Sequence, residues 1–543
     1  MPRSVNEPAI GPALALFVVT ALAIGGVWWW LGSPVILPPS PLAQGGKLYC
    51  VSYVPYQNGE DPLVEGTRVN PVEIDRDLEL LSKYSNCVRT YSIKDGIESV
   101  LTSARKYRLK VLEGLWLSSD PEKNRVQIAT TIRLANQFPD VVAAIVVGNE
   151  VLLRGEMTAT DLVSTIHEVK SQVPEPVTYA DVWEFWLRYP DVASAVDFVT
   201  IHILPYWEDF PIPAANAAAH VESIHRRIAT AFPNKEILIG EFGWPSAGRM
   251  REGARPSPSN QARAIEETLA LAQRDNFRVN VVEAFNQPWK RWLEGSVGGE
   301  WGIFSRATGL PKFNLAGGGV SDHPAWRIQA LAGILLAALS FGAAFMVVRN
   351  KPAPPLLWWR IAALTFLPAV LFGWTIETIP VESYTAGGWL RLLAFAAIAA
   401  IAPIVCAVAC AQGRPLPTFA ALLGRRGELR AALSWTLGLT FTAVVLFSVQ
   451  AALGLVFDPR DRDIDFAPFA AAVVPFLVLF FSTPRQFGAR AIAERVAACV
   501  LAASAIYIVL NESFANWQAV WFCAVLLGLA FILARARDAP NLE

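Results

Sequence analysis

Two glutamates stand where short apolar runs end, a placement that suits acid–base and nucleophilic chemistry. Glu150 follows residues 144–147 and a Gly-Asn pair, and Glu241 follows residues 237–239 and a glycine. Two carboxylates that face each other can cleave a glycosidic bond, because one protonates the leaving oxygen while the other attacks the anomeric carbon. We therefore predict Glu150 as the general acid/base and Glu241 as the nucleophile. The alternative is that both are structural members of ion pairs.

The segments around these glutamates predict an α/β fold, a (β/α)8 TIM barrel. Short β-branched and aromatic runs predict strands at residues 48–53, 87–91, 111–117, 142–148, 177–180, 198–203, 237–240 and 279–285. Amphipathic segments predict helices at residues 73–83, 126–137, 159–172, 217–232 and 260–274. Strands that alternate with helices in this way are typical of the barrel, whose chemistry lies at the carboxyl ends of its strands. Glu150 and Glu241 would follow the fourth and seventh strands and face each other across the barrel mouth.

The rest of the chain predicts an all-α, multi-span transmembrane domain. Apolar runs near the roughly 20 residues that cross a bilayer occupy residues 12–31, 328–348, 356–375, 389–411, 433–457, 467–481, 496–510 and 517–533. The first run ends in Trp28, Trp29 and Trp30, which suits an interfacial aromatic belt and an uncleaved signal anchor. A cleavable signal peptide is the alternative.

Charged residues between the apolar runs predict the orientation of the helices. One set of loops carries Arg349, Lys351, Arg360, Arg414, Arg425, Arg426, Arg430, Arg485, Arg490, Arg495, Arg535 and Arg537. The alternate loops carry Glu377, Glu382, the acidic segment 458–465, Asn511 and Glu512. The positive-inside rule then places both termini in the cytoplasm and the predicted barrel on the opposite, periplasmic side.

Few ionisable residues lie deep within the apolar runs, which argues against an ion-coupled transporter. Arg360 and Arg391 lie near the ends of their runs and are expected to reach toward the interface. The membrane domain is therefore interpreted as an anchor, a surface for docking a partner, or a passage for a polymer.

Composition argues against two classes of site. The net charge is −1, so no nucleic-acid partner is expected. The six cysteines form no CxxC or Cys/His cluster, so neither a metal nor another cofactor is expected. Cys50 and Cys87 fall on the first two predicted strands, where a disulfide is allowed but not required. The cysteines of the apolar runs are expected to be buried: Cys406, Cys410, Cys499 and Cys523.

The sequence around both glutamates resembles glycoside hydrolase family 17. Two runs are similar to its signature motifs, Val147-Gly148-Asn149-Glu150 and Gly240-Glu241-Phe242-Gly243-Trp244-Pro245-Ser246. Three more resemble its bacterial, membrane-bound branch: Val88-Arg89-Thr90-Tyr91, Ile201-His202-Ile203-Leu204-Pro205-Tyr206-Trp207-Glu208 and Glu283-Ala284-Phe285-Asn286-Gln287-Pro288-Trp289-Lys290. The runs occur in the family's order and cover nearly the whole predicted barrel, so the set is specific although each run alone is weak.

The resemblance implies a retaining mechanism on β-1,3-linked glucans, with Glu150 as acid/base and Glu241 as nucleophile. It also implies that Asn149 bonds the sugar 2-hydroxyl beside the cleaved linkage. Tyr206 is expected to bond and orient the nucleophile. Retention requires carboxyl groups about 5 Å apart, which leaves no room for a water molecule between them.

Other polar residues near the predicted strand ends have both a functional and a structural interpretation. Arg89 and Tyr91 would support the nucleophile or line the sugar site, while a structural ion pair is the alternative for Arg89. Glu283 would bind sugar hydroxyls or form a salt bridge. Asn286 and His202 are placed among the sugar-site residues, although a buried, hydrogen-bonded structural role is the commoner one for such a histidine.

Tryptophans near the predicted strand ends can stack on sugar rings, while some of them must belong to the core. Trp183 and Trp289 are the favoured platforms, and Trp244 is also assigned to the sugar site. The remaining candidates are Trp186, Trp207 and Trp301.

The catalytic pair specifies a covalent glucosyl-enzyme but not the acceptor that releases it. Bacterial family members with such membrane segments are associated with glucan remodelling and β-1,3/β-1,6-glucan synthesis. We therefore expect a retaining glucanosyltransferase that elongates or branches a β-1,3-glucan, with β-1,6 links as one candidate product. A membrane-bound endo-β-1,3-glucanase and an inactive glucan-binding module of an exporter are the alternatives. No nucleotide-sugar donor is expected, because the longest predicted inside loop, residues 412–432, is too short to hold one.

These expectations define the predicted organisation of the chain. A cytoplasmic N-terminus (1–11), a signal anchor (12–31) and a linker (32–46) precede a periplasmic catalytic domain (47–323). A domain of about seven transmembrane helices (324–535) and a cytoplasmic tail (536–543) follow. The expected location is a bacterial inner (plasma) membrane. The expected partners are the lipid bilayer, a β-glucan or laminari-oligosaccharide substrate, and a glucan synthase or exporter.

Overall fold

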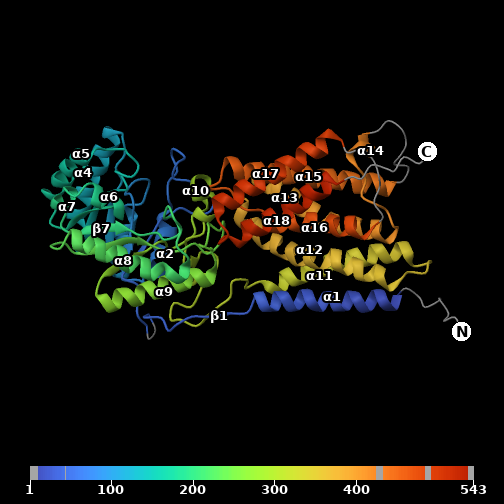
Figure 1. Cartoon of the computed structure of the whole chain (residues 1–543). Coiled ribbons are helices and arrows are strands. Elements are labelled where there is room, and N and C mark those ends of the chain that lie inside the picture. Colours follow the sequence, from blue (N-terminus) through green and yellow to red (C-terminus); the bar gives the residue numbers. More distant parts are fainter. Residues whose placement is uncertain (1–9, 43–44, 424–431, 484–490, 536–543) are drawn as a thin grey trace. The chain divides into compact units, whose positions relative to one another are not determined.

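The computed structural model describes residues 10–42, 45–423, 432–483 and 491–535 (Figure 1). The chain divides into two compact units. The barrel unit comprises Pro34–Ala247 and Gly253–Val320, and the helical unit comprises Met1–Ser33, Gly248–Glu252 and Ser321–Glu543.

The barrel unit contains a closed barrel of eight parallel strands, which confirms the predicted fold class. Its strands are β2 (Cys50–Ser52), β3 (Cys87–Arg89), β4 (Lys110–Leu115), β5 (Val142–Asn149), β6 (Val177–Val182), β7 (Val199–His202), β8 (Ile237–Phe242) and β9 (Arg278–Val281). Neighbours in sequence pair with each other, and β9 pairs with β2 to close the barrel. The predicted last strand is too long, because the backbone N–H of Glu283 bonds to Trp301 rather than to a barrel strand. Glu283 therefore follows β9.

Helices connect the strands, and several begin at a residue that caps them. The longer ones are α2 (Pro71–Leu81), α3 (Ser99–Tyr107), α4 (Pro121–Gln137), α5 (Ala159–Lys170), α8 (Ala217–Ala231) and α9 (Pro258–Asp275). The side chains of Asn70, Asp120, Thr158 and Ser257 accept hydrogen bonds from the first turns of α2, α4, α5 and α9. All five predicted helices are present. The sequence analysis missed α3 and the short helices α6 (Trp183–Arg188), α7 (Val192–Ala195) and α10 (Arg291–Gly298).

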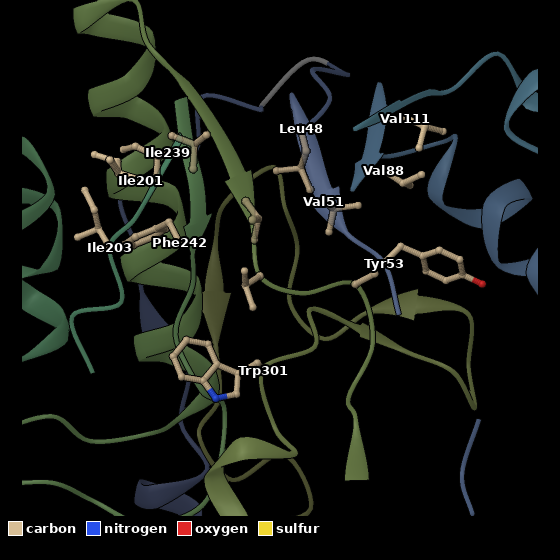
Figure 2. Packing of buried hydrophobic residues seen from close by; sticks show 14 of the residues in the cluster. Leu48, Val51, Tyr53, Val88, Val111, Ile201, Ile203, Ile239, Phe242 and Trp301 are labelled. Atoms are coloured by element: carbon tan, nitrogen blue, oxygen red, sulfur yellow. The ribbon is translucent and has the colours of Figure 1, made fainter. Parts of the chain in front are cut away.

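Branched apolar side chains from successive strands fill the barrel core. Val51 of β2 lies in register with Val88 of β3, and Ile201 of β7 lies in register with Ile239 of β8. Figure 2 shows these residues with Phe242, the last residue of β8, and all of them are buried. This close packing fixes the carboxyl ends of the strands, where the candidate site lies.

The two cysteines of the barrel form a disulfide. Cys50 on β2 and Cys87 on β3 are joined across neighbouring strands, with their Cα atoms 4.3 Å apart. The sequence allowed this disulfide without requiring it, and the structure contains it. Such bonds are typical of proteins that fold in an oxidising compartment.

Among its described residues, the helical unit contains seven helices that are long and apolar enough to cross a membrane. They are α1 (Ile10–Leu31), α11 (Trp326–Val348), α12 (Pro355–Glu382), α13 (Ala386–Ala411), α15 (Ala432–Phe457), α17 (Ile492–Glu512) and α18 (Trp517–Ala534). The remaining predicted span is α16 (Phe466–Ser482), an apolar helix of only 17 residues. Figure 1 shows α1, α11 and α12 running alongside one another.

Two details of the membrane prediction are wrong. Glu377 and Glu382 were expected in a loop, but α12 continues through Glu382, so both lie in its last turns. The expectation that Arg391 reaches toward the interface stays a prediction, and its guanidinium bonds to the Asp465 carboxylate at 2.6 Å. Cys499 is exposed on its helix, whereas the other three cysteines of the apolar runs are buried as predicted.

Part of the charge pattern used for orientation lies outside the described residues. This applies to Arg425, Arg426, Arg430, Arg485, Arg490 and Arg537. For these arginines, the predicted orientation of the helices in the membrane is supported by the sequence alone.

A buried carboxyl on β4 makes the stability of the barrel depend on pH. Glu113 is 1% exposed, and neither of its carboxyl oxygens has a hydrogen-bond partner among the described residues. Burial, aided by the nearby Glu175 carboxylate, raises its pKa from 4.5 to about 8. Because the folded state holds this proton more tightly than the unfolded state, the free energy of unfolding is expected to fall by up to about 4 kcal/mol as pH rises from 4.5 through 8.

Glu113→Gln is expected to remove this dependence and leave the barrel more stable than the wild type at pH 8. Melting temperatures measured between pH 5 and pH 9 test it. The exposed Glu98, which forms no cap bond at α3, provides the control Glu98→Gln. Identical pH profiles for wild type and Glu113→Gln would contradict the assignment.

Candidate active site

The candidate acid/base lies on a sharp turn at the carboxyl end of β5. Glu150 directly follows the strand and has a left-handed backbone conformation with φ 54°, and Gly148 has φ 87°. Left-handed conformations are uncommon for residues other than glycine and often occur at functional sites. The turn stays within hydrogen-bonding reach of β6, because the N–H of Glu150 donates to the carbonyl of Ala180 at 2.8 Å.

The candidate nucleophile is held by a buried arginine. Glu241 lies within β8, and its Oε1 accepts a hydrogen bond from Arg89 Nη1 at 3.1 Å. Arg89 ends β3 and is 1% exposed, so its charge is removed from solvent. It also donates to the Gly240 carbonyl at 2.7 Å and to Asn149 Oδ1 at 2.6 Å. Of the two interpretations of Arg89, the geometry favours a group that supports the nucleophile.

A histidine lies between the two candidate catalytic carboxylates. His202, the last residue of β7, is 1% exposed. Its Nδ1 lies 2.8 Å from Glu150 Oε1, and its Nε2 lies 3.5 Å from Glu241 Oε1. The imidazole therefore contacts Glu150 directly and lies close to Glu241, which is more than the structural role that the sequence favoured.

Burial and the neighbouring charged groups have opposite effects on the pKa of Glu150. Burial is the largest influence and raises its pKa, but the hydrogen bond and charge of His202 and the charges of Arg89 and Arg154 together outweigh burial. The pKa of Glu150 is therefore held below its ordinary value. A general acid with a lowered pKa is protonated only at acidic pH, so this arrangement favours activity below neutrality.

Replacing His202 should move the alkaline limb of the pH–activity profile to higher pH. Without the imidazole, burial dominates at Glu150, its pKa rises, and the acid stays protonated over a wider range. Profiles of kcat/KM for His202→Gln and wild type test this, with the exposed His167 on α5 providing the control His167→Gln. A limb that stays in place, or moves to lower pH, would contradict the assigned interaction.

Three further residues were predicted to lie near Glu150 and Glu241. Asn149 accepts the bond from Arg89 through Oδ1, which leaves its amide N–H groups to donate to a ligand. The Tyr91 hydroxyl lies 2.9 Å from Ser52 Oγ, and the Arg89 guanidinium lies over the Tyr91 ring at 4.8 Å. Burial, with the nearby Glu241 charge, raises the pKa of Tyr91 well above its ordinary value. Tyr206 is fully buried and packs edge-on against Trp207.

Glu283 forms the salt bridge that was one of its two interpretations. Its Oε2 lies 3.0 Å from Lys290 Nζ, and Glu283 is 1% exposed. Burial raises the pKa of Glu283 despite the lysine. The neighbouring Glu294 is also affected mainly by burial, which raises its pKa to about 7. Asn286 is engaged by the protein, since its amide donates to Glu300 and its Oδ1 accepts from Gly302 N at 3.0 Å.

The tryptophans divide between core and surface. Trp244 was assigned to the sugar site, but it is completely buried with its Nε1 bonded to the Arg255 carbonyl, so that expectation is wrong. Trp186 and Trp301 are also buried. Trp183 and Trp289 remain half-exposed, as platforms require, although the Arg227 guanidinium lies 4.9 Å from the Trp183 ring centre. Trp207 is half-buried and stacks on Trp301.

The sequence analysis missed the residues that hold the Glu150 turn. Arg154 donates to the carbonyls of Asn149 and Leu117. The Tyr179 hydroxyl accepts from Leu152 N at 3.0 Å and donates to Asp181, a buried residue of β6. Burial raises the pKa of Asp181 to about 6. The only sequence signal was that Tyr179 lies on the strand predicted at residues 177–180 and that Asp181 directly follows it.

The two candidate catalytic glutamates and His202 are arranged in a way that could hold a metal ion. Glu150, His202 and Glu241 each present a ligand atom, and these atoms lie within 4.8 Å of one another. Arg89 also reaches this place, with Nη1 3.1 Å from Glu241 Oε1 and 3.4 Å from His202 Nε2. The protein thus places its own buried cation beside Glu241 and His202.

The barrel is similar to known glycoside hydrolases. Residues 50–302 match the BtgE/BtgC glycoside hydrolase domain. A glucan 1,3-beta-glucosidase of Arthroderma benhamiae is 27% identical over 46% of this chain and 86% of its own length. A glucan 1,3-beta-glucosidase of Schizosaccharomyces pombe is 26% identical over 51% of this chain and 88% of its own.

A solved structure also aligns with the barrel. The glycoside hydrolase family 17 beta-1,3-glucanosyltransferase from Rhizomucor miehei is 22% identical, with a TM-score of 0.42 over 49% of this chain and 97% of the other. The glycoside hydrolase resemblance inferred from the sequence is confirmed, while the bacterial branch stays a prediction. The match to the BtgE/BtgC glycoside hydrolase domain spans the barrel strands from β2 to β9 and does not include the helices after residue 302.

Proposed function

We propose that this protein is a retaining transglycosylase of β-1,3-glucan. The observation that carries the proposal is the separation of its two candidate catalytic groups: a carboxylate oxygen of Glu150 lies within 4.8 Å of one of Glu241. Retaining glycosidases hold their carboxyl groups about 5–5.5 Å apart, whereas inverting enzymes need about 6.5–9.5 Å to admit a water between them.

In the proposed first step, Glu241 attacks and Glu150 protonates. The Glu241 carboxylate forms a bond to the anomeric carbon as the bond to the leaving oxygen breaks, and Glu150 gives its proton to that oxygen. Arg89 holds Glu241 in position through their 3.1 Å hydrogen bond. The amide of Asn149 is positioned to donate to a sugar hydroxyl, in keeping with its proposed contact to the 2-hydroxyl.

In the second step, Glu150 acts as a base. Its carboxylate takes the proton of an acceptor hydroxyl, whose oxygen attacks the anomeric carbon and displaces Glu241. The configuration at that carbon is restored after the two inversions. The acceptor decides the outcome, because a sugar hydroxyl gives a longer or branched glucan and water gives hydrolysis.

The substrate class is supported by relatives. The fungal proteins that align with the barrel are named glucan 1,3-beta-glucosidases, and a structural neighbour is named a beta-1,3-glucanosyltransferase in complex with laminaritriose. Transfer is the proposed outcome because the described part of the chain includes seven helices that are long and apolar enough to cross a membrane. An anchored barrel is suited to processing a glucan that is made or exported at that membrane.

We propose that the barrel lies outside the cytoplasm of a bacterial cell, with both chain termini inside. The Cys50–Cys87 disulfide supports an oxidising compartment. The basic loop residues of the helical unit, such as Arg349 and Lys351, support the orientation through the positive-inside rule. The proposed partners of the helical unit are the bilayer and a glucan synthase or exporter.

The products made from laminari-oligosaccharides test this function. The full chain in detergent, incubated with one oligosaccharide at high concentration, is expected to give products both longer and shorter than the donor. NMR of the longer products then identifies β-1,3 or β-1,6 links. Products that are only shorter would overturn the transferase proposal in favour of an endo-β-1,3-glucanase, and no turnover would favour a glucan-binding module.

A further inference from the structure

A cavity outside the catalytic pair lies at the same end of the barrel. It has a volume of about 200 Å³ and is lined by Lys94, Trp116, Ser118, Lys123, Asn124 and Gln127. Trp116 directly follows β4, and Gln127 belongs to α4, which begins just after it. The cavity is smaller than the roughly 300–1,000 Å³ of sites for drug-sized ligands, and suits one small ring.

One buried atom of the cavity lacks a partner. Gln127 is 2% exposed, and its Nε2 donates to Ser92 Oγ at 3.2 Å. Its Oε1 is buried and accepts no hydrogen bond from any described residue. Buried polar atoms are rarely left in this state, so the atom selects a ligand that brings a hydroxyl or amide hydrogen. An anion, which carries only acceptors, would be repelled by it.

The other walls provide a mixed apolar and polar lining. Trp116 is half-exposed and adds an indole surface, while Lys94 and Lys123 are exposed and offer ammonium donors. Asn124 is held in place by exchanging bonds with the Ser118 backbone, accepting from its N–H at 2.8 Å and donating to its carbonyl at 2.6 Å. Aromatic surface beside several donors and an acceptor is the lining that binds a pyranose, whose C–H face stacks while its hydroxyls bond.

The cavity is joined to the Glu150 turn by one arginine. The Arg154 guanidinium lies over the Trp116 ring at 4.3 Å and donates to the carbonyls of Leu117 and Asn149. The segment that carries the indole and the turn that carries Glu150 are thus fixed to each other. A polymer bound at the catalytic pair is then close to a second, preformed place for one of its sugars.

We propose that this cavity is a remote subsite that binds a glucosyl unit of the β-glucan away from the bond that is cleaved. The subsite rests on the proposed function and extends it, because it gives the enzyme a preference for long donors. Binding at a distance from the reacting bond lowers KM for chains long enough to reach the cavity and leaves shorter ones unaffected.

The test compares full-length Gln127→Met and Trp116→Ala with wild type on laminari-oligosaccharides of increasing length. The ratio of kcat/KM for long to short donors is expected to fall about tenfold, the loss expected for one stacked and hydrogen-bonded sugar. Trp116→Ala removes the contact with Arg154 and could thereby disturb the Glu150 turn. Gln127→Met keeps that contact, so a loss seen in both variants comes from the cavity and not from the turn. The control is Val126→Ala, an exposed residue of the same helix that does not line the cavity.

Calorimetric titration with the longest oligosaccharide separates this inference from the proposed function. Weaker binding by Gln127→Met, with Val126→Ala unchanged, supports the subsite even if no donor is turned over. An unchanged ratio and unchanged binding in both cavity variants would overturn it. Equal losses for short and long donors, or binding only of sulfated oligosaccharides, would overturn it as well.

Discussion

Replacing Glu241 by glutamine is expected to lower the turnover of laminari-oligosaccharides by about 10⁴-fold or more. The amide has nearly the shape of the carboxylate, but it cannot form the covalent bond to the anomeric carbon. It can still accept the hydrogen bond that Arg89 now gives to Oε1, so the fold should survive. Initial rates of product formation, with circular dichroism as a check on folding, measure the effect.

The matched control lies at the other end of the same strand. Glu236 directly precedes β8 and is largely exposed in an ion pair with Arg278, so Glu236→Gln should retain nearly full activity. If a folded Glu241→Gln protein kept more than about a hundredth of the wild-type rate, another residue would have to be the nucleophile.

Replacing Glu150 by glutamine is expected to lower the rate of cleavage by an amount that depends on the leaving group of the substrate. Turnover of glucans should fall by about 10³-fold, because their leaving oxygen needs a proton. A dinitrophenyl β-glucoside needs none, so formation of the glucosyl-enzyme should be largely preserved and its breakdown should become slow. Added azide, which attacks without a general base, should restore turnover and give the β-glucosyl azide.

Glu156 provides the control for this second substitution. It lies in the same loop and pairs with Arg154 at 2.7 Å, so Glu156→Gln tests whether loss of charge near the turn suffices. That variant should neither discriminate between leaving groups nor respond to azide. An α-glucosyl azide, or no rescue by azide in a folded Glu150→Gln protein, would show that Glu150 is not the acid/base.

The sequence was sufficient for those features that follow from periodicity and motif. The eight strands and the two candidate catalytic glutamates could be located because alternating apolar segments end at recognisable motifs. The first predicted span, residues 12–31, corresponds to α1 (Ile10–Leu31), since an apolar run of bilayer length is hard to mistake. The end of β9 was misplaced because Val282 and Ala284 are apolar and still donate backbone hydrogen bonds to β8 and β2, while the N–H of Glu283 between them donates to Trp301 instead.

Contacts between distant residues could not be predicted in the same way. The bridge that His202 makes between Glu150 and Glu241 depends on three strands meeting at one end of the barrel. The burial of Trp244 depends on its neighbours in space, because a tryptophan after a strand can face either solvent or core. Similarly, the missing partner of Gln127 Oε1 becomes visible only once the cavity is formed.

The configuration of the first product tests the central claim most directly. Proton NMR, recorded immediately after the full-length protein is mixed with a laminari-oligosaccharide, distinguishes the β anomer from the α anomer before they interconvert. A catalytic pair whose oxygens lie within 4.8 Å predicts that the new reducing end or glycosidic link is formed as β. A first product in the α configuration would mean that the reaction inverts, and would contradict the covalent role assigned to Glu241.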